Sequence, residues 1–274
     1  MAAERVHVTG AGGQVGTALR DVLPGARYLT HDELDVTDAA AVTSALRGAH
    51  CVVHLAAMTH VDQCEEQPEQ ALAVNETGTR NVCRAAPQAR LIYLSTDYVF
   101  AGSIPDEYTE DDDPGPLNVY GKTKLAGEHA VLERPGGLVV RTSWVYGDGR
   151  NFLRSVLEAA SAGRQLRVVD DQRGRPTNAD SIAAAIIYLL DRPVTGVIHI
   201  ADMGTPASWA EVADVALRAA GLTSPVTRIT SAEYGAAAAR PANSTLCLTL
   251  ARQLGVPLRD WREGVERYAR AWAA

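Results

Sequence analysis

The chain has 274 residues, of which 46% are hydrophobic and 22% are charged, a composition typical of a folded globular protein. Its formal net charge of −7 offers no basic surface for a phosphate backbone, so we expect no nucleic-acid partner. The length predicts one or two domains, at roughly 150 residues per domain.

The first residues and the apolar runs argue against export and membrane insertion. MAAERVHVTG lacks the basic segment and long apolar core of a secretory signal. The longest apolar candidate, AAAIIYLL, is far shorter than the roughly 18 residues that span a bilayer. We therefore expect a cytoplasmic protein without membrane contact. The cysteines lack CxxC spacing and the histidines lack HExxH spacing, which predicts reduced thiols and no metal site.

Short β-branched runs alternate with helical stretches through the first half of the chain. Runs typical of buried parallel strands lie at 5–10, 51–57, 90–96, 137–143 and 196–201. Between them, apolar residues recur at three- and four-residue spacing in helices expected over 38–48, 68–86 and 119–132. This alternation predicts an α/β fold, a Rossmann-type doubly wound parallel sheet.

The alternation loosens after residue 145, which predicts a smaller α/β second lobe. The pattern weakens through 151–163 and 168–178, a long helix is expected around Ser181 to Leu190, and Ser208 and Glu211 have the spacing of a capping box. We assign 1–145 to the first domain and 146–274 mainly to the second lobe. A segment at about 176–200 is expected to return to the first domain.

TGAGGQVG lies between the first expected strand and the first helix. Its spaced glycines are Gly10, Gly13 and Gly16. Glycine permits a tight turn and a close approach of backbone to pyrophosphate, and the following helix offers free amides to the anion. Asp35, 19 residues after Gly16, is placed to contact the adenosine half of a dinucleotide. Alternatively, Asp35 merely precedes a helix capped by Thr37 or Asp38.

Two further strands end in residues suited to a ligand crevice. CVVHLAAMTH (51–60) ends in small alanines that let a planar ligand approach the backbone. RLIYLSTDYVF (90–100) brings Ser95 to Tyr98 to the same sheet edge, where open α/β sheets bind ligands. A helix beginning near Asn118 sets Tyr120 and Lys124 one turn apart. A lone YxxxK is more often an exposed helix, but the glycine turn and strand-end threonine favour a site.

These stretches resemble the extended short-chain dehydrogenase/reductases and, more closely, the dTDP-4-dehydrorhamnose reductase family. The resemblance rests on GGQVG (12–16), LDVTD (34–38), AAMTHVDQCE (56–65), STDYVF (95–100), PLNVYGKTKLAGE (116–128), RTSWVYG (141–147), VVDDQRGRPT (168–177) and RPANS (240–244). It implies NAD(P)H-dependent reduction of the C4 ketone of a dTDP-4-keto-6-deoxy sugar, in the last step of dTDP-L-rhamnose synthesis. It also implies that 1–145 is an NAD(P)-binding domain and that 146–274 is mainly a substrate-binding lobe.

The resemblance implies roles for individual residues. Tyr120 would protonate the ketone oxygen, Lys124 would lower the pKa of Tyr120 and hold the nicotinamide ribose, and Thr96 would hydrogen-bond the carbonyl. Cofactor-contact positions are Gly10, Gly13, Gln14, Val15, Gly16, Asp35, Val36, Ala56, Ala57, Met58, Thr59, Tyr120 and Lys124. Substrate positions are Thr96, Asp97, Tyr98, Trp144, Arg175, Thr177 and Arg240. Trp144 could equally belong to a core, and the arginines to surface ion pairs.

Some positions depart from the family pattern. Thr30 and His31 follow the second strand, where some relatives place an acid that favours NADH or an arginine that favours NADPH. The absence of an acid leads us to expect NADPH, with NADH left open. Ala18 stands where enteric members carry a glutamate of a magnesium-linked dimer. We expect no such metal, and a homodimer of another kind stays open.

Three alternatives remain at this stage. One is a 4-ketoreductase for another dTDP-deoxysugar of secondary metabolism. A second is an epimerase or 4,6-dehydratase, although a dehydratase would carry an acidic pair after Thr96, where this chain has Asp97 and Tyr98. The third is a non-catalytic regulatory subunit of the same fold. The stereochemistry at C4 depends on which sugar face the pocket presents.

Overall fold

The chain folds around one parallel β-sheet. The computed structural model describes residues 3–274, and within them six strands pair in the order β2-β1-β3-β4-β5-β9. Neighbouring strands run parallel, with Val8 opposite Val53 and Val53 opposite Ile92. The strands are β1 (Val6–Thr9), β2 (Arg27–Leu29), β3 (Cys51–His54), β4 (Arg90–Thr96), β5 (Gly137–Thr142) and β9 (Gly196–His199).

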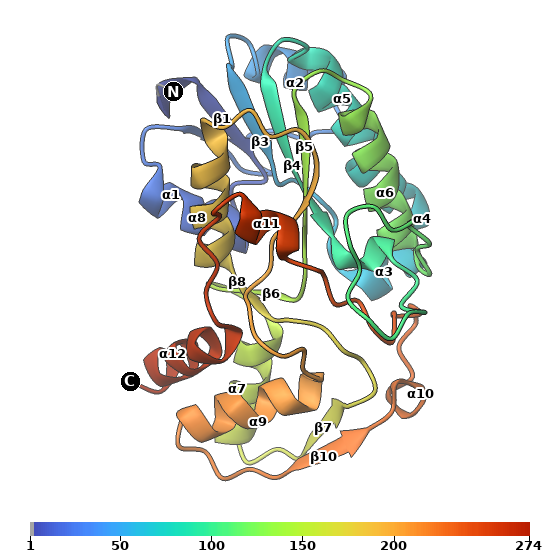
Figure 1. Cartoon of the computed structure of the whole chain (residues 1–274), viewed down its shortest axis with the longest axis vertical. Coiled ribbons are helices and arrows are strands. Elements are labelled where there is room, and N and C mark those ends of the chain that lie inside the picture. The colour runs from blue at the N-terminus through green and yellow to red at the C-terminus, as the bar shows by residue number, and fades with distance from the viewer. Residues whose placement is uncertain (1–2) are drawn as a thin grey trace.

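Helices cover both faces of this sheet (Figure 1). On one face, α1 (Gln14–Val22) and α8 (Ala179–Leu190) pack against each other, and Leu19 and Ile182 join a buried cluster with Val8 and Val53. On the other face, Val82 and Val131 pack with Leu91 and Tyr93. The elements of that side are α2 (Ala39–Ala45), α3 (Val61–Glu66), α4 (Pro68–Leu72), the π-helix η2 (Ala73–Thr77), α5 (Gly78–Ala85) and α6 (Val119–Leu132).

A second lobe lies beyond the carboxyl edge of the sheet (Figure 1). Its helices α7 and α9 pack on each other and on the two-stranded sheet of β7 and β10, and α12 packs on α9. Trp261, fully buried, is the largest side chain of its core. The elements are α7 (Phe152–Ser161), β7 (Leu166–Val169), α9 (Trp209–Ala219), β10 (Val226–Ile229), α10 (Ser231–Tyr234) and α12 (Trp261–Ala273).

The chain passes between the lobes several times. β6 (Val145–Tyr146) pairs with β8 (Thr177–Asn178) below the main sheet, and α8 then runs back along α1 to the edge strand β9. Near the carboxyl end, α11 (Thr249–Gln253) contacts β9 before the chain reaches α12. The lobes therefore share several connecting segments.

The Rossmann-type α/β class expected from the sequence is confirmed. The expected helix over 119–132 coincides with α6, and the capping box of Ser208 and Glu211 is present at the start of α9. The single helix expected over 68–86 is instead α4, the π-helix η2 and α5 in succession. Strands β7 and β10 were not predicted, because their short, partly exposed sequences lack the buried pattern of the main sheet.

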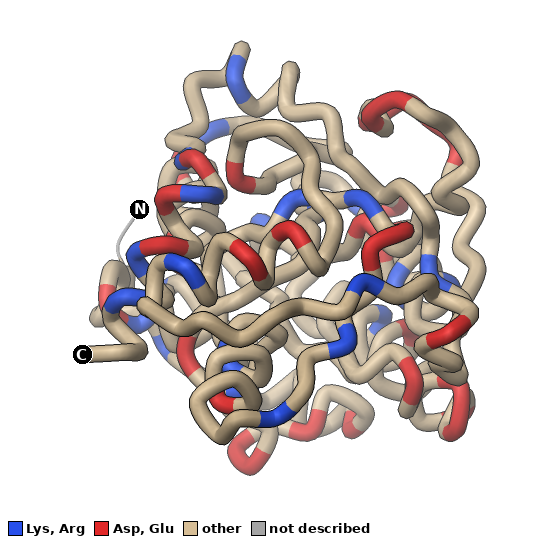
Figure 2. The backbone as a smooth tube through the Cα atoms, turned by 90° about the horizontal axis from the view of Figure 1, so that it is seen from below, with Lys and Arg blue, Asp and Glu red and all other residues tan. Residues whose placement is uncertain are grey.

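Figure 2 shows basic and acidic residues intermingled over the second lobe in the view from below. Within residues 3–274, no helix combines the length and apolar character needed to cross a bilayer. The same part of the chain holds no group of three or more His, Cys, Asp or Glu residues arranged to bind a metal. All four cysteines are free thiols.

Candidate active site

A cavity of about 930 Å³ opens at the carboxyl ends of the sheet strands and extends to the second lobe. This volume lies in the range of cofactor and substrate pockets. Of the cofactor positions expected from the sequence, those that line it are Gly10, Gly13, Gln14, Val15, Gly16, Asp35, Val36, Ala56, Ala57, Thr59, Tyr120 and Lys124. Of the substrate positions, those that line it are Thr96, Asp97, Tyr98 and Trp144.

The glycine-rich turn is shaped to take a pyrophosphate. Gly10 has φ +70°, and a Cβ added there would lie 2.4 Å from the backbone nitrogen of Ala56. A Cβ on Gly16 would lie 2.6 Å from the Cα of Ala11, so α1 packs tightly against the turn. Gly13 caps α1 without a side-chain hydrogen bond, which leaves the first amides of the helix free for an anion. The turn therefore fits a dinucleotide.

Asp35 both lines the cavity and organises the turn after β2. Its Oδ1 accepts hydrogen bonds from the amide and the hydroxyl of Thr37 at 2.8 and 2.7 Å, and these bonds lower the pKa of Asp35. Asp38, not Thr37, caps α2. Met58 lies outside the lining, and its amide donates to Asn75 Oδ1 at 2.8 Å. Asn75 thus fixes the loop that follows β3.

Helix α6 brings Tyr120 and Lys124 to the cavity because two glycines let it lie close to its neighbours. A Cβ on Gly121 would lie 2.2 Å from the carbonyl oxygen of Tyr98, and one on Gly127 would lie 2.4 Å from the hydroxyl of Tyr93. The rings of Tyr98 and Tyr120 meet edge to face, with centroids 6.2 Å apart. Gly121 and Gly127 therefore allow α6 to place the phenol of Tyr120 close to the residues at the end of β4.

Burial dominates the electrostatics of Tyr120 and Lys124. It raises the pKa of the Tyr120 phenol, against the effect of a side-chain hydrogen bond with Thr96. It lowers the pKa of Lys124 to about 7. The ammonium group donates to the carbonyl of Leu94 at 2.8 Å and lies 4.0 Å from the centroid of the Tyr93 ring. The expected lowering of the Tyr120 pKa by Lys124 stays a prediction.

Asp97 is a buried carboxyl at the floor of the cavity. Thr96 Oγ1 donates to its Oδ1 at 3.1 Å, and the Ser244 hydroxyl, from the RPANS segment, donates to its Oδ2. Burial raises the pKa of Asp97 to about 7, and the hydrogen bonds of Ser244 and Thr96 act against that rise. A carboxyl of this kind exchanges a proton near neutral pH.

Trp144 reaches the cavity through an unusual backbone conformation. It is the one non-glycine residue of the described chain with positive φ, at 46°. Its indole stacks on Trp209 with centroids 3.7 Å apart and planes 9° from parallel. Gly174 lies against it, since a Cβ there would come within 2.6 Å of the indole. Such a backbone costs on the order of 1 kcal/mol and marks a position that the surroundings hold in place.

The structure does not bring Arg175, Thr177 and Arg240 to the cavity lining. Arg175 is buried and donates to the carbonyls of Gly204 and Leu246, each at 2.7 Å, and it pairs with Glu107. Thr177 is fully buried on β8. Arg240 pairs with Asp62 at 2.8 Å, which ties the RPANS segment to α3. All three therefore connect segments of the fold.

Several lining residues were missed by the sequence analysis. They are Gly12, Thr30, His31, Asp32, Leu34, Leu55, Val61, Val74, Leu94, Thr142, Val145, Asp148, Gly149, Arg150, Asn151 and Trp209. Thr30 and His31 were considered only for the choice between NADH and NADPH, whereas Ser95, expected at this sheet edge, does line the cavity. Trp209 follows the capping serine of α9 and lies 65 residues after Trp144 in the sequence. Nothing in the local sequence of Trp209 indicates that it lines the same cavity. Only tertiary packing joins these positions.

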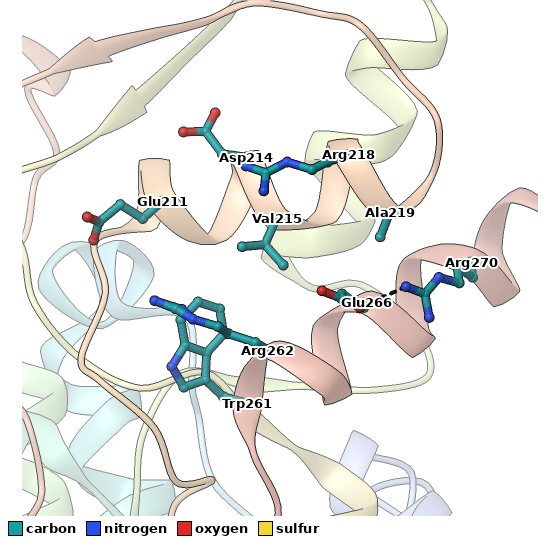
Figure 3. Close-up of a pocket in the computed structure, with 9 residues that line it drawn as sticks. All are labelled: Glu211, Asp214, Val215, Arg218, Ala219, Trp261, Arg262, Glu266 and Arg270. Atoms are coloured by element: carbon teal, nitrogen blue, oxygen red, sulfur yellow. Dashed lines mark hydrogen bonds and ion pairs between the residues drawn. The ribbon is translucent and has the colours of Figure 1, made fainter.

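A second cavity, of about 400 Å³, lies between α9 and α12 (Figure 3). Arg262 lies over the ring of Trp261 at 4.5 Å, and Glu266 pairs with Arg270 at 2.7 Å. None of the expected site residues lines it. Its acidic side chains Glu211 and Asp214 pair with Arg173 and Arg228 outside it. This cavity is separate from the cavity that holds Tyr120.

Comparison with known proteins agrees with this geometry. The family model described as RmlD substrate binding domain matches residues 4–273. A dTDP-4-dehydrorhamnose reductase of Mycolicibacterium smegmatis is 39% identical over 277 residues, which cover 96% of this chain and 84% of the relative. A probable dTDP-4,6-dihydroxy-2-methyloxan-3-one 4-ketoreductase of Streptomyces antibioticus is 38% identical, covering 94% and 92%.

A solved structure is also similar along nearly the whole chain. The crystal structure of a dTDP-4-dehydrorhamnose reductase from Bacillus anthracis, in complex with NADP, superposes with a TM-score of 0.92 at 35% identity. The match covers 96% of this chain and 97% of that one. The similarity therefore extends over both lobes and the cavity between them.

Proposed function

The chain belongs to the family of the RmlD substrate binding domain, and from that membership we propose that it reduces dTDP-4-dehydro-L-rhamnose to dTDP-L-rhamnose with NADPH. It is an NADP-dependent oxidoreductase of the extended short-chain dehydrogenase/reductase type. The observation that carries the proposed reduction is the joint lining of one cavity by the glycine turn, Thr96 and Tyr120. Cytoplasmic localisation and a homodimer stay predictions.

The cofactor half of the cavity suits a nicotinamide dinucleotide. The turn at Gly10 leaves no room for a side chain, and the free amides at the start of α1 can donate hydrogen bonds to a pyrophosphate. Asp35 lines the same cavity and is proposed to contact the adenosine half of the cofactor. When bound, NADPH supplies the hydride that reduces the ketone carbon. Lys124, at the inner end, is proposed to hold the nicotinamide ribose.

The proton half of the reaction is assigned to Tyr120 and Thr96. As the ketone carbon gains hydride, negative charge develops on its oxygen, and Tyr120 donates the proton that yields the alcohol. Thr96 contributes a hydrogen bond to the same oxygen and interacts with the phenol. Asp97, Tyr98 and Trp144 are proposed to hold the deoxysugar. These assignments are supported by the shared cavity and by the matching family motifs.

The test is oxidation of NADPH in the presence of freshly generated dTDP-4-dehydro-L-rhamnose, followed by identification of the sugar. We expect oxidation that depends on the keto sugar and yields dTDP-L-rhamnose. A parallel assay with NADH measures the cofactor preference. Cofactor binding without oxidation of this sugar would contradict the proposed substrate.

A second candidate is reduction of another dTDP-4-keto sugar. The relative from Streptomyces antibioticus, whose name specifies a different ketoreduction, is 38% identical, nearly the 39% of the mycobacterial reductase. The same assay with other dTDP-4-keto-6-deoxy sugars distinguishes the two candidates by their kcat/KM values. Turnover of none of these sugars would favour a non-catalytic subunit of this fold.

A further inference from the structure

Helix α6 carries a third ionisable residue in register with Tyr120 and Lys124. Glu128 follows Lys124 by four residues, so the three side chains lie along one face of the helix. Glu128 is fully buried, and nothing in the reaction assigned above uses it. Burying a carboxylate lowers the stability of the fold unless the group is paired, so a carboxylate retained beside the active site suggests a functional role.

The carboxylate of Glu128 is held in position by an arginine and a serine. Arg141 on β5 donates Nε at 3.0 Å and 3.2 Å to its two oxygens and Nη2 at 2.7 Å to Oε2. Ser95, next to Thr96 on β4, donates its hydroxyl at 2.5 Å. This bidentate arginine pair and the added hydrogen bond give the buried carboxylate the partners that its burial requires.

Lys124 has no such direct partner. Among the residues that the structure describes, no carboxylate lies within ion-pairing distance of its ammonium group, which rests between the Leu94 carbonyl and the Tyr93 ring. Burial disfavours its charge, and within this part of the chain Glu128 is the group that opposes this effect. The glycine at 127 lets α6 approach β4 closely enough to enclose both side chains.

The other groups near Lys124 leave Glu128 as the source of negative charge that acts on this lysine. His54 on β3 lies near Lys124, and burial lowers the pKa of His54 to about 3, so it is neutral at physiological pH. Burial raises the pKa of Tyr93 on β4, which keeps its phenol neutral. The titratable and charged groups that face Lys124, Glu128 and Arg141 are His54, Tyr93, Tyr120, Glu110 and His199.

We propose that Glu128, fixed by Arg141 and Ser95, is a positioning residue that stabilises the charged form of Lys124. This inference rests on the proposed function, because the charge is needed only if Lys124 serves the reduction. Glu128 touches neither substrate nor cofactor and acts through Lys124. Its loss would make the lysine shed its proton at lower pH and weaken its effect on Tyr120.

The chain offers a direct measurement, because Lys122 and Lys124 are its two lysines. In protein labelled with ¹³C/¹⁵N-lysine, the side-chain resonances titrate separately, and Lys122→Arg assigns them. Lys122 is exposed and serves as the internal reference. We expect Lys124 to titrate at lower pH than Lys122, and Glu128→Gln to lower its midpoint further by about half a pH unit or more.

A matched variant separates charge from shape. Glu128→Asp keeps the charge and shortens the side chain, whereas Glu128→Gln keeps the shape and removes the charge. We expect the titration midpoint of Lys124 in Glu128→Asp to lie nearer the wild-type value than the midpoint in Glu128→Gln. If Glu128→Gln fails to fold with Arg141 unpaired, Glu128→Gln/Arg141→Met removes both charges, and we expect it to lower the midpoint as well.

The pH dependence of turnover provides the functional readout. In Glu128→Gln, the high-pH limb of kcat/KM should move to lower pH together with the Lys124 midpoint. An unchanged or raised midpoint in Glu128→Gln, or a larger displacement in Glu128→Asp, would overturn the proposal. Absence of turnover in the wild-type chain would instead contradict the proposed function, while the lysine titration would still decide the role of Glu128.

Discussion

The cavity is lined by two regions that differ in how they hold their side chains. At the inner end, Thr96, Asp97 and Lys124 are buried, and each makes hydrogen bonds to neighbouring groups. Toward the second lobe, the stacked indoles of Trp144 and Trp209 are partly exposed. The first region is rich in ionisable groups with shifted pKa values, and the second is dominated by aromatic surface.

This difference assigns distinct tasks to the two regions. Burial makes the protonation state of a side chain sensitive to its neighbours, which suits proton transfer. Partly exposed aromatic surface buries a ligand without needing a particular charge, which suits selection of a sugar or a base. We therefore expect changes in the inner region to alter kcat and pH dependence, and changes in the outer region to alter KM and preference.

The largest expected effect comes from Tyr120→Phe in the inner region. Removing the phenol hydroxyl deletes the proton donor, and kcat should fall by about 10³-fold, within the usual range for a general acid. NADPH binding, measured by fluorescence titration, should change by less than about threefold, since the ring remains.

Tyr234→Phe is the matched control, because Tyr234 is exposed on α10 and lies outside the cavity lining. This control should keep wild-type turnover. If Tyr120→Phe were about as active as the control, Tyr120 would not be the proton donor, and the inner region would not be the site of proton transfer.

Asp97→Asn tests the inner region through stability. Burial raises the pKa of Asp97 from 3.8 to about 7, so the fold favours its neutral form. The unfolded chain then binds fewer protons than the folded one between these pH values, and stability falls as pH rises through that window. At pH 8 Asp97→Asn should be more stable than the wild type by on the order of 2 kcal/mol, and the difference should vanish near pH 4.

Urea unfolding at pH 8 and pH 4 measures this difference in stability. The kcat/KM of Asp97→Asn should fall about tenfold, because the variant loses a carboxyl group from the floor of the cavity. A stabilising change that reduces activity would indicate that the buried acid is retained for function. Equal stability of the two proteins at pH 8 would show that folding does not raise the pKa of Asp97.

The two regions also differ in how much of them the sequence predicted. The inner region consists of contiguous motifs, since a strand end places Thr96 and Asp97, and a helical turn separates Tyr120 from Lys124. Local spacing was enough to group these residues, and the α/β class followed from the alternation of strands and helices. The partner of Asp97, however, is Ser244, 147 residues away, and no local pattern predicts that contact.

The outer region depends on tertiary packing. Trp144 enters the cavity only because its backbone adopts positive φ and Trp209 arrives from α9 to stack on it. Arg175, expected at the substrate from its motif, donates to carbonyls of two connecting segments and does not line the cavity. A motif gives the residue type and its order in the chain, but the direction of a long side chain depends on segments distant in sequence.

Trp144→Ala sharpens the comparison at the outer region. Losing the indole removes an aromatic surface and leaves Trp209 without its stacking partner, so KM for the keto sugar should rise about tenfold. The value of kcat should fall by less than about threefold, because the proton donor is untouched. Trp144→Phe, which keeps a ring, should lie between this variant and the wild type. A fall confined to kcat would place Trp144 with the chemistry of the inner region.

The smallest expected effect lies apart from both regions, at the cofactor end of the cavity, in the turn after β2. Thr30 donates its amide and hydroxyl to Glu33 Oε2, each at 2.9 Å, so that carboxylate is engaged within the turn, while His31 is exposed and lines the cavity. An arginine at 31 would offer a planar pair of donors to a 2′-phosphate. His31→Arg should therefore raise the ratio of kcat/KM for NADPH to that for NADH by about threefold to tenfold.

His129→Arg, on an exposed position of α6 away from the cavity, adds the same charge and should leave that ratio unchanged. Equal shifts in both variants would mean that the overall charge of the protein sets the preference, since a long-range field acts from either site. A shift confined to His31→Arg would assign cofactor choice to a single exposed turn. Exposed residues would then tune selection by small factors, because solvent screens their charges, whereas the buried residues near Tyr120 control the rate by large ones.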